Sequence, residues 1–119
     1  MHKILIIDSD KQFRKLLVEL LCTKDFTVLL AENESTAKSF LQQSDIDLII
    51  ADVGKKENDL TKLICVLLVN PSGIKTKTIA MSGDPKKLQL FQGKVSGIHV
   101  KGQQSIEDLT NLIHLVLDG

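Results

Sequence analysis

The chain has 119 residues, carries 15 basic and 15 acidic side chains, and is 43% hydrophobic. A single domain of this length buries a substantial core, so this composition excludes an intrinsically disordered chain. With a net charge of zero and aromatic residues limited to four Phe, the chain has no overall field and few rings for binding nucleic acid, and we expect one domain spanning residues 1–119 that does not bind nucleic acid directly.

The N-terminal half alternates short apolar runs with segments of helical spacing. Residues 4–7 form a continuous apolar run that ends in Asp8 and is too short for a signal-peptide core or a membrane span. We therefore expect a buried strand, no membrane contact and a cytoplasmic location. The pattern then predicts a helix on Phe13, Leu16, Leu17, Leu20 and Leu21 with Asp10 as its cap, a strand at 27–31, a helix on Ala37, Phe40 and Leu41 capped by Asn33 or Ser35, and a strand at 48–51.

The C-terminal half repeats this alternation. Helical spacing runs from Leu60 to Leu68 and stops at the turn sequence of residues 70–73. Asp84 followed by Pro85 has the order expected at a helix start, and Ser105 with Asp108 resembles a capping box. The pattern predicts strands at 78–81 and 97–100, a short helix near 88–91 and a last helix over 109–117.

Strands and helices that alternate in this way predict a parallel sheet with right-handed crossovers and helices on both faces. The expected fold class is therefore α/β, as a three-layer, doubly wound, five-stranded parallel sheet. In such sheets ligands bind at the carboxyl ends of the strands, where the winding direction changes. The residues that directly follow the apolar runs are thus the first candidates for a functional site.

Four polar residues stand at these strand ends: Asp8, Asp52, Ser82 and Lys101. Two neighbouring carboxylates repel each other unless a cation lies between them, and either a divalent ion or the Lys101 ammonium can fill that place. Magnesium prefers oxygen ligands and leaves positions for water and a phosphate. The pattern indicates a hard-cation site beside an incoming phosphoryl group, with Asp52 as the nucleophile.

Four fragments at residues 4–10, 47–52, 81–83 and 100–101 resemble the landmarks of the response-regulator receiver domain of two-component signalling. They occur in the same order and at similar spacing, and the resemblance covers the whole chain. It implies a single receiver domain with a flavodoxin-like fold, strand order 2-1-3-4-5, and a site at the ends of the first and third strands.

The resemblance also implies a metal site. Asp8 and Asp52 would hold Mg²⁺ together with the backbone carbonyl of Gly54, and the Ser9 hydroxyl is a further candidate ligand. Ser9 stands where the family has a second acidic residue, so we expect magnesium binding to be weak.

The same resemblance implies a phosphorelay role. Asp52 would accept a phosphoryl group from a histidine kinase or phosphotransfer protein, Lys101 would contact a phosphoryl oxygen, and Ser82 would be the switch hydroxyl. A downstream protein target or a fused output domain would read the change, and a homodimer is a further option. The domain would not be an enzyme beyond its own phosphoryl transfer and dephosphorylation.

Two positions near the last strand depart from the family pattern. Ile98 stands at the place of an aromatic switch residue, and Gly102 replaces the Pro that follows the Lys, which predicts a looser loop. Together with Ser9, these departures leave open a second reading, a phosphorylation-independent pseudo-receiver that acts as a protein-interaction module. A flavin or nucleotide binder is less favoured, because the turn after the first strand is acidic and lacks glycine.

The cysteines and histidines do not form a site in the sequence. Cys22 and Cys65 lie in apolar surroundings without metal-ligand spacing, so we expect two buried, reduced thiols. His2, His99 and His114 share no spacing for a metal and are expected to be structural or solvent-facing.

Overall fold

A computed structural model of the chain describes residues 2–8, 10–22, 26–43, 45–53, 76–93 and 95–118. The described strands pair in parallel as one sheet of order β2-β1-β3-β4-β5. This architecture confirms the predicted fold class and strand order. The strands are β1 (His2–Ile7), β2 (Phe26–Ala31), β3 (Leu48–Asp52), β4 (Lys77–Ser82) and β5 (Gly97–Val100).

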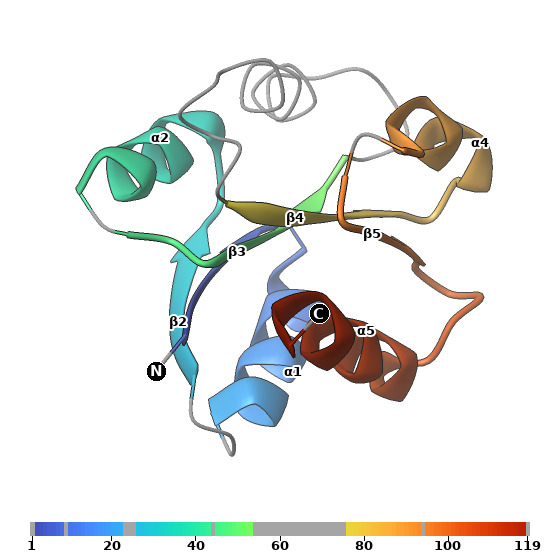
Figure 1. The fold of residues 1–119 in the computed structure, drawn as a ribbon, viewed down its shortest axis with the longest axis horizontal. Coiled ribbons are helices and arrows are strands. Elements are labelled where there is room, and N and C mark those ends of the chain that lie inside the picture. The colour runs from blue at the N-terminus through green and yellow to red at the C-terminus, as the bar shows by residue number, and fades with distance from the viewer. Residues whose placement is uncertain are drawn as a thin grey trace.

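Helices cover both faces of this sheet, so the three-layer prediction is confirmed as well. Figure 1 shows α1 and α5 on one face and α2 and α4 on the other. The helices are α1 (Lys11–Cys22), α2 (Glu34–Gln43), α4 (Pro85–Leu88), which continues as the 3₁₀ turn Gln89–Phe91, and α5 (Ile106–Asp118). The predicted helix at 60–68 and the turn at 70–73 lie outside the described residues.

The predicted helix caps are present as hydrogen bonds. Asn33, rather than Ser35, caps α2, because the Asn33 Oδ1 atom accepts from the Thr36 amide at 2.9 Å. At α5 the capping box is reciprocal: the Ser105 Oγ atom accepts from the Asp108 amide at 3.0 Å, and the Asp108 carboxylate accepts from the Ser105 amide at 2.9 Å. The Asp10 carboxylate caps α1 by accepting from the Gln12 and Phe13 amides, and the Asp84 carboxylate caps α4 by accepting from the Lys86 amide.

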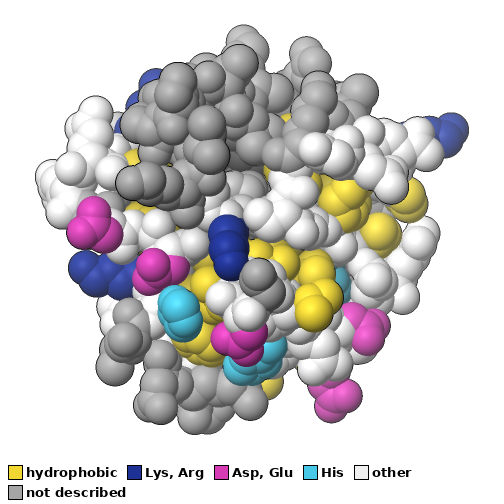
Figure 2. Space-filling view, viewed as in Figure 1, with side chains coloured by type: hydrophobic (Ala, Val, Ile, Leu, Met, Phe, Trp, Pro, Cys, Tyr) yellow, Lys and Arg dark blue, Asp and Glu magenta, His cyan; other side chains and the backbone are white. Residues whose placement is uncertain are grey.

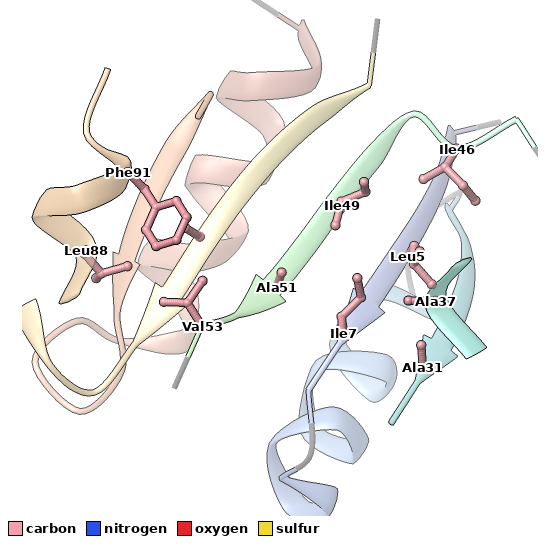
Figure 3. Packing of buried hydrophobic residues seen from close by; sticks show 11 residues of the cluster. Leu5, Ile7, Ala31, Ala37, Ile46, Ile49, Ala51, Val53, Leu88 and Phe91 are labelled. Atoms are coloured by element: carbon pink, nitrogen blue, oxygen red, sulfur yellow. The ribbon is translucent and has the colours of Figure 1, made fainter. Parts of the chain in front are cut away.

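The central strand β1 explains why the apolar runs are continuous. Leu5 and Ile7 pack on the side of α2 and α4, whereas Ile4 and Ile6 pack on the side of α1 and α5, and all four are fully buried. Figure 3 shows the first of these clusters, with its residues drawn from the sheet and from both flanking helices. Since helices cover both faces, no position in the middle of β1 meets water.

One sequence prediction about a side chain is wrong: Cys22 is exposed, not buried. The buried positions of α1 include Leu17 and Leu21, which lie four residues apart on one helix face. Cys22 follows Leu21 by one residue, which is about 100° of rotation, so its thiol points away from the sheet. Cys65 lies outside the described residues.

The surface carries both signs of charge. On the face that Figure 2 shows, basic, acidic and histidine side chains lie interspersed around apolar side chains. Within the described residues, no helix has the length and apolar character needed to cross a membrane.

Candidate functional site

The sheet register brings the four predicted strand-end residues to one edge. Asp8 follows β1, Asp52 ends β3, Ser82 ends β4, and Lys101 follows β5. The backbone bond from the Lys101 amide to the Ser82 carbonyl, at 2.9 Å, continues the pairing of β4 and β5 beyond the last strand residue. The roles assigned to these residues from the family remain predictions, whereas their common location is a property of the parallel sheet.

Lys101 joins the two carboxylates. Its Nζ atom lies 3.0 Å from the Oδ2 atom of Asp8 and 2.8 Å from the Oδ2 atom of Asp52. The side chain of Asp8 is 0% exposed, whereas those of Lys101 and Asp52 are 16% and 18% exposed. The cluster therefore has a buried acid at its base and an acid and an amine that solvent reaches. The Lys101 ammonium thus lies between the carboxylates, as one of the two arrangements considered from the sequence has it.

The remaining contacts of Asp8 and Lys101 come from α1 and the turn before it. The Asp8 Oδ1 atom accepts from the Asp10 amide at 2.8 Å, so both carboxylate oxygens of Asp8 are bonded. The Lys101 Nζ atom also lies 4.2 Å from the centroid of the Phe13 ring, which is within the range of a cation–π contact. The sequence placed Phe13 among core positions of α1, and only the folded geometry shows this second role.

The pKa values of Asp8 and Lys101 are both raised, but for different reasons. Burial raises the pKa of Asp8, and the hydrogen bonds from Asp10 and Lys101 offset this only in part. For Lys101, burial alone would lower the pKa, but the hydrogen bonds to Asp52 and Asp8 and the charges of these acids raise it above its ordinary value. The ammonium is thus firmly protonated near neutral pH.

Ser82 links the site to the start of α4. It is fully buried, and its Oγ atom accepts from the Asp84 amide at 3.0 Å. Asp84 in turn caps α4 through the Lys86 amide. A movement of the Ser82 side chain would therefore act directly on the turn that begins this helix.

The carboxylates of Asp8 and Asp52 supply the protein oxygens of a candidate cation site. One ammonium touches an oxygen of each, so both oxygens converge on a single cation position. In the part of the chain that the structure describes, no group of three or more His, Cys, Asp or Glu residues could hold a metal ion. The other predicted ligands, Ser9 and the carbonyl of Gly54, lie outside the described residues. A magnesium ion bound by one or two carboxylates and several waters fits this donor set.

The loop after β5 differs from the looser loop expected from sequence. Gly102 has φ +86°, a conformation that Pro cannot adopt because its ring fixes φ near −65°. The Gln104 side chain accepts from the Val100 amide at 2.8 Å, and the Gln104 amide donates to the Val100 carbonyl at 3.0 Å. These bonds close the loop that carries Lys101. Polar Gln residues in such a loop gave no signal of this role in the sequence.

The comparisons with known proteins agree with this architecture. No family model matches the chain. A segment of 53 residues, or 44% of the chain, is 42% identical to the transcriptional regulatory protein CpxR of Klebsiella pneumoniae subsp. pneumoniae (strain HS11286), and the match covers 22% of that protein.

Solved structures match the whole chain. The signal receiver domain of the DNA-binding response regulator merR from Colwellia psychrerythraea 34H superposes with a TM-score of 0.86 at 19% identity, with 100% of each chain covered. The response regulator TrrA from Thermotoga maritima, solved in complex with Mg²⁺ and BeF, gives a TM-score of 0.82 at 20% identity and covers 98% of this chain and 100% of its own. The chain therefore has the fold of the response-regulator receiver domains, and the resemblance indicated by its sequence is confirmed.

Proposed function

We propose that the chain is a receiver domain that accepts a phosphoryl group on Asp52 from the phosphohistidine of a histidine kinase or phosphotransfer protein. The observation that carries this proposal is the Asp8–Lys101–Asp52 cluster at the carboxyl edge of the sheet. Asp52 is the more exposed acid of the pair, so a donor reaches it before it reaches Asp8. The proposal takes residues 1–119 as one such domain.

The transfer is an in-line displacement at phosphorus. An oxygen of Asp52 forms a new bond to phosphorus while the bond from phosphorus to the histidine nitrogen breaks. The electron pair of that bond stays on the imidazole, which takes up a proton. The product is an acyl phosphate on Asp52. The Lys101 ammonium, 2.8 Å from the Asp52 carboxylate, is placed to contact a phosphoryl oxygen and to offset its charge.

Magnesium belongs to this proposal as a weakly held cofactor. Asp8 and Asp52 would hold it, with Gly54 and Ser9 as the further ligands inferred from sequence. When bound, it would supply positive charge to the phosphoryl oxygens during transfer. The complex of the structural neighbour TrrA with Mg²⁺ and BeF supports the assignment by analogy.

The consequence of phosphorylation would be a shift between two conformations. Ser82 would turn toward the phosphoryl group, which changes its bond to the Asp84 amide and thereby the start of α4. A downstream protein, a fused output domain or a second copy of the chain would read this change. The cytoplasm is the expected location. The domain acts in this scheme as a phosphorylated signal carrier and not as an enzyme on a separate substrate.

One observation favours a second candidate, the phosphorylation-independent pseudo-receiver. The Lys101 ammonium already bonds both acids and offsets part of their charge without a metal or a phosphoryl group. A module of this kind would keep the fold and present its surface to a partner regardless of kinase activity.

Intact-protein mass spectrometry after incubation with magnesium and a small phosphodonor such as acetyl phosphate separates the two candidates. The receiver predicts the mass of one added phosphoryl group on the wild type and none on Asp52→Asn. The matched control is Asp45→Asn, which changes an exposed aspartate before β3 and should be phosphorylated like the wild type.

Each outcome decides the question. Loss of the added mass in Asp52→Asn alone supports phosphorylation at Asp52. An unmodified wild type under conditions that modify a known receiver supports the pseudo-receiver. Equal modification of the wild type and Asp52→Asn overturns Asp52 as the acceptor.

A further inference from the structure

We propose that Phe13 is a positioning residue: its ring holds the Lys101 ammonium between Asp8 and Asp52, and so sets how readily this site exchanges the ammonium for magnesium. The part of this inference that concerns magnesium rests on the proposed function. The part that concerns the metal-free protein stands on contacts within the chain.

The first step is that hydrogen bonds through Asp10 connect Phe13 to Asp8. The Asp10 amide donates to one oxygen of Asp8, and the Asp10 carboxylate accepts from the Phe13 amide at 3.2 Å. This chain of bonds fixes the first turn of α1 relative to the carboxylate. The Phe13 ring and the buried acid therefore approach Lys101 as one unit, although Lys101 comes from a loop more than 80 residues further along the chain.

The second step is that the ring faces the charged end of Lys101. The Nζ atom lies 4.2 Å from the ring centroid while it also bonds both carboxylates. The lysine side chain is only 16% exposed, so water screens this attraction less than it would on an open surface. A leucine at this position would fill similar space but would offer no ring face to the ammonium.

The third step concerns competition for one place. The ammonium and a metal ion bound by Asp8 and Asp52 would need the same carboxylate oxygens, so they exclude each other in part. An interaction that stabilises only the state with the ammonium between the acids makes the free energy of metal binding less favourable by the free energy of that interaction. The free energy of a cation–π contact, from exposed to partly buried sites, corresponds to a change of about 2- to 30-fold in the affinity for magnesium.

The test compares Phe13→Leu, which removes the ring, with Phe13→Tyr, which keeps it. In metal-free protein, the NMR signals of the Lys101 side chain next to the ammonium should show a ring-current shift in the wild type and in Phe13→Tyr, and lose it in Phe13→Leu. In a magnesium titration followed by NMR, Phe13→Leu should bind about 2- to 30-fold more tightly than the wild type, and Phe13→Tyr should match the wild type.

The control is Phe40→Leu, which trims a partly buried Phe on the opposite side of the sheet. It should change neither the Lys101 signals nor the magnesium affinity, whereas a general loosening of the fold would change both. Phe13→Met serves as a second ring-free variant if Phe13→Leu does not give a folded spectrum.

Two results overturn the proposal. The first is an unchanged Lys101 signal in a folded ring-free variant. The second is a magnesium affinity that does not rise in that variant while its Lys101 signal does change. Neither readout uses a phosphodonor, so a failure of phosphorylation at Asp52 leaves this test intact, and a failure here leaves the phosphorylation result intact.

Discussion

At the scale of one residue, burial in the sheet lowers the pKa of His99. The side chain is buried on β5, two residues before Lys101 in the chain. Burial lowers its pKa from 6.5, Asp108 partly offsets this, and the charge of Lys101 lowers it further. The folded protein therefore keeps His99 neutral at pH values where the unfolded chain has begun to bind a proton.

This difference predicts that acid weakens the fold. As pH falls below 6.5, the unfolded state takes up a proton at His99 that the folded state does not, so the free energy of unfolding falls by at most about 1.4 kcal/mol per pH unit. Asp8 acts in the opposite direction, because its raised pKa lets the folded state bind a proton more readily than the unfolded state. Urea unfolding of the wild type and His99→Gln between about pH 7.5 and 5.5 separates the two effects.

The part of the pH dependence of the unfolding free energy that is absent in His99→Gln is due to His99. Parallel slopes for the wild type and His99→Gln would contradict the assignment.

At the scale of one element, α5 depends on its reciprocal cap. The helix carries Leu109, Ile113 and Val116 into the core below β1, β3 and β4, and its first turn is closed by Ser105 and Asp108. The hydrogen bonds from Ser105 also lower the pKa of Asp108, so this carboxylate stays ionised near the positive end of the helix.

We expect Ser105→Ala to lower the free energy of unfolding by about 1 kcal/mol, since it removes the acceptor for the Asp108 amide. The measurement is the midpoint of urea unfolding at constant slope. Ser96→Ala, in the loop before β5, is not a matched control because Ser96 also bonds Thr78. Ser39→Ala, on the exposed face of α2, is suitable and should change the midpoint by much less. A midpoint for Ser105→Ala equal to that of Ser39→Ala would exclude the cap as a source of stability.

The sequence was most informative about the positions of the helices and strands. The predicted strand 97–100 coincides with β5, and the other four predicted strands fall one or two residues short of the observed ends, because strands extend into polar residues such as His2, Lys77 and Ser82 whose backbones still pair. The caps were predictable from local chemistry. The exposed Cys22 was not, because its apolar neighbours suggested burial while the helix phase turned it outward.

At the scale of the whole molecule, two cores share one sheet. Leu5 belongs to the core under α2 and α4, and Ile6 belongs to the core under α1 and α5. Both are fully buried, whereas Leu30 on the edge strand β2 is 40% exposed. Damage to either core should therefore weaken the whole sheet.

We expect Leu5→Ala and Ile6→Ala each to lower the free energy of unfolding by about 2 to 5 kcal/mol, since each leaves a cavity in a covered layer. Leu30→Ala, the matched control, should cost clearly less because its side chain already meets water. Urea unfolding followed by circular dichroism provides the comparison. A cost for Leu30→Ala as large as that for Leu5→Ala would show that the edge strand carries more of the stability than its burial indicates.

The site was predictable in part at this scale. Alternating strands and helices were enough to expect Asp8, Asp52, Ser82 and Lys101 at one edge, because parallel strands end together. The sequence did not show how Lys101 reaches both acids, since that depends on how the loop after β5 folds. Gly102 and Gln104 set that loop through a positive φ angle and a side-chain bond, and the ring of Phe13 meets Lys101 only after folding.

The apolar residues inside β1, β3 and β4 are separate from the polar residues that end or follow strands, and this separation has a consequence for how the chain can change over generations. Exchange of one aliphatic residue for another in β1, β3 or β4 acts on packing and stability, whereas exchange at Asp8, Asp52 or Lys101 acts on the charged cluster. The charged cluster can therefore change while the scaffold is kept, and the scaffold can diverge widely around an unchanged cluster.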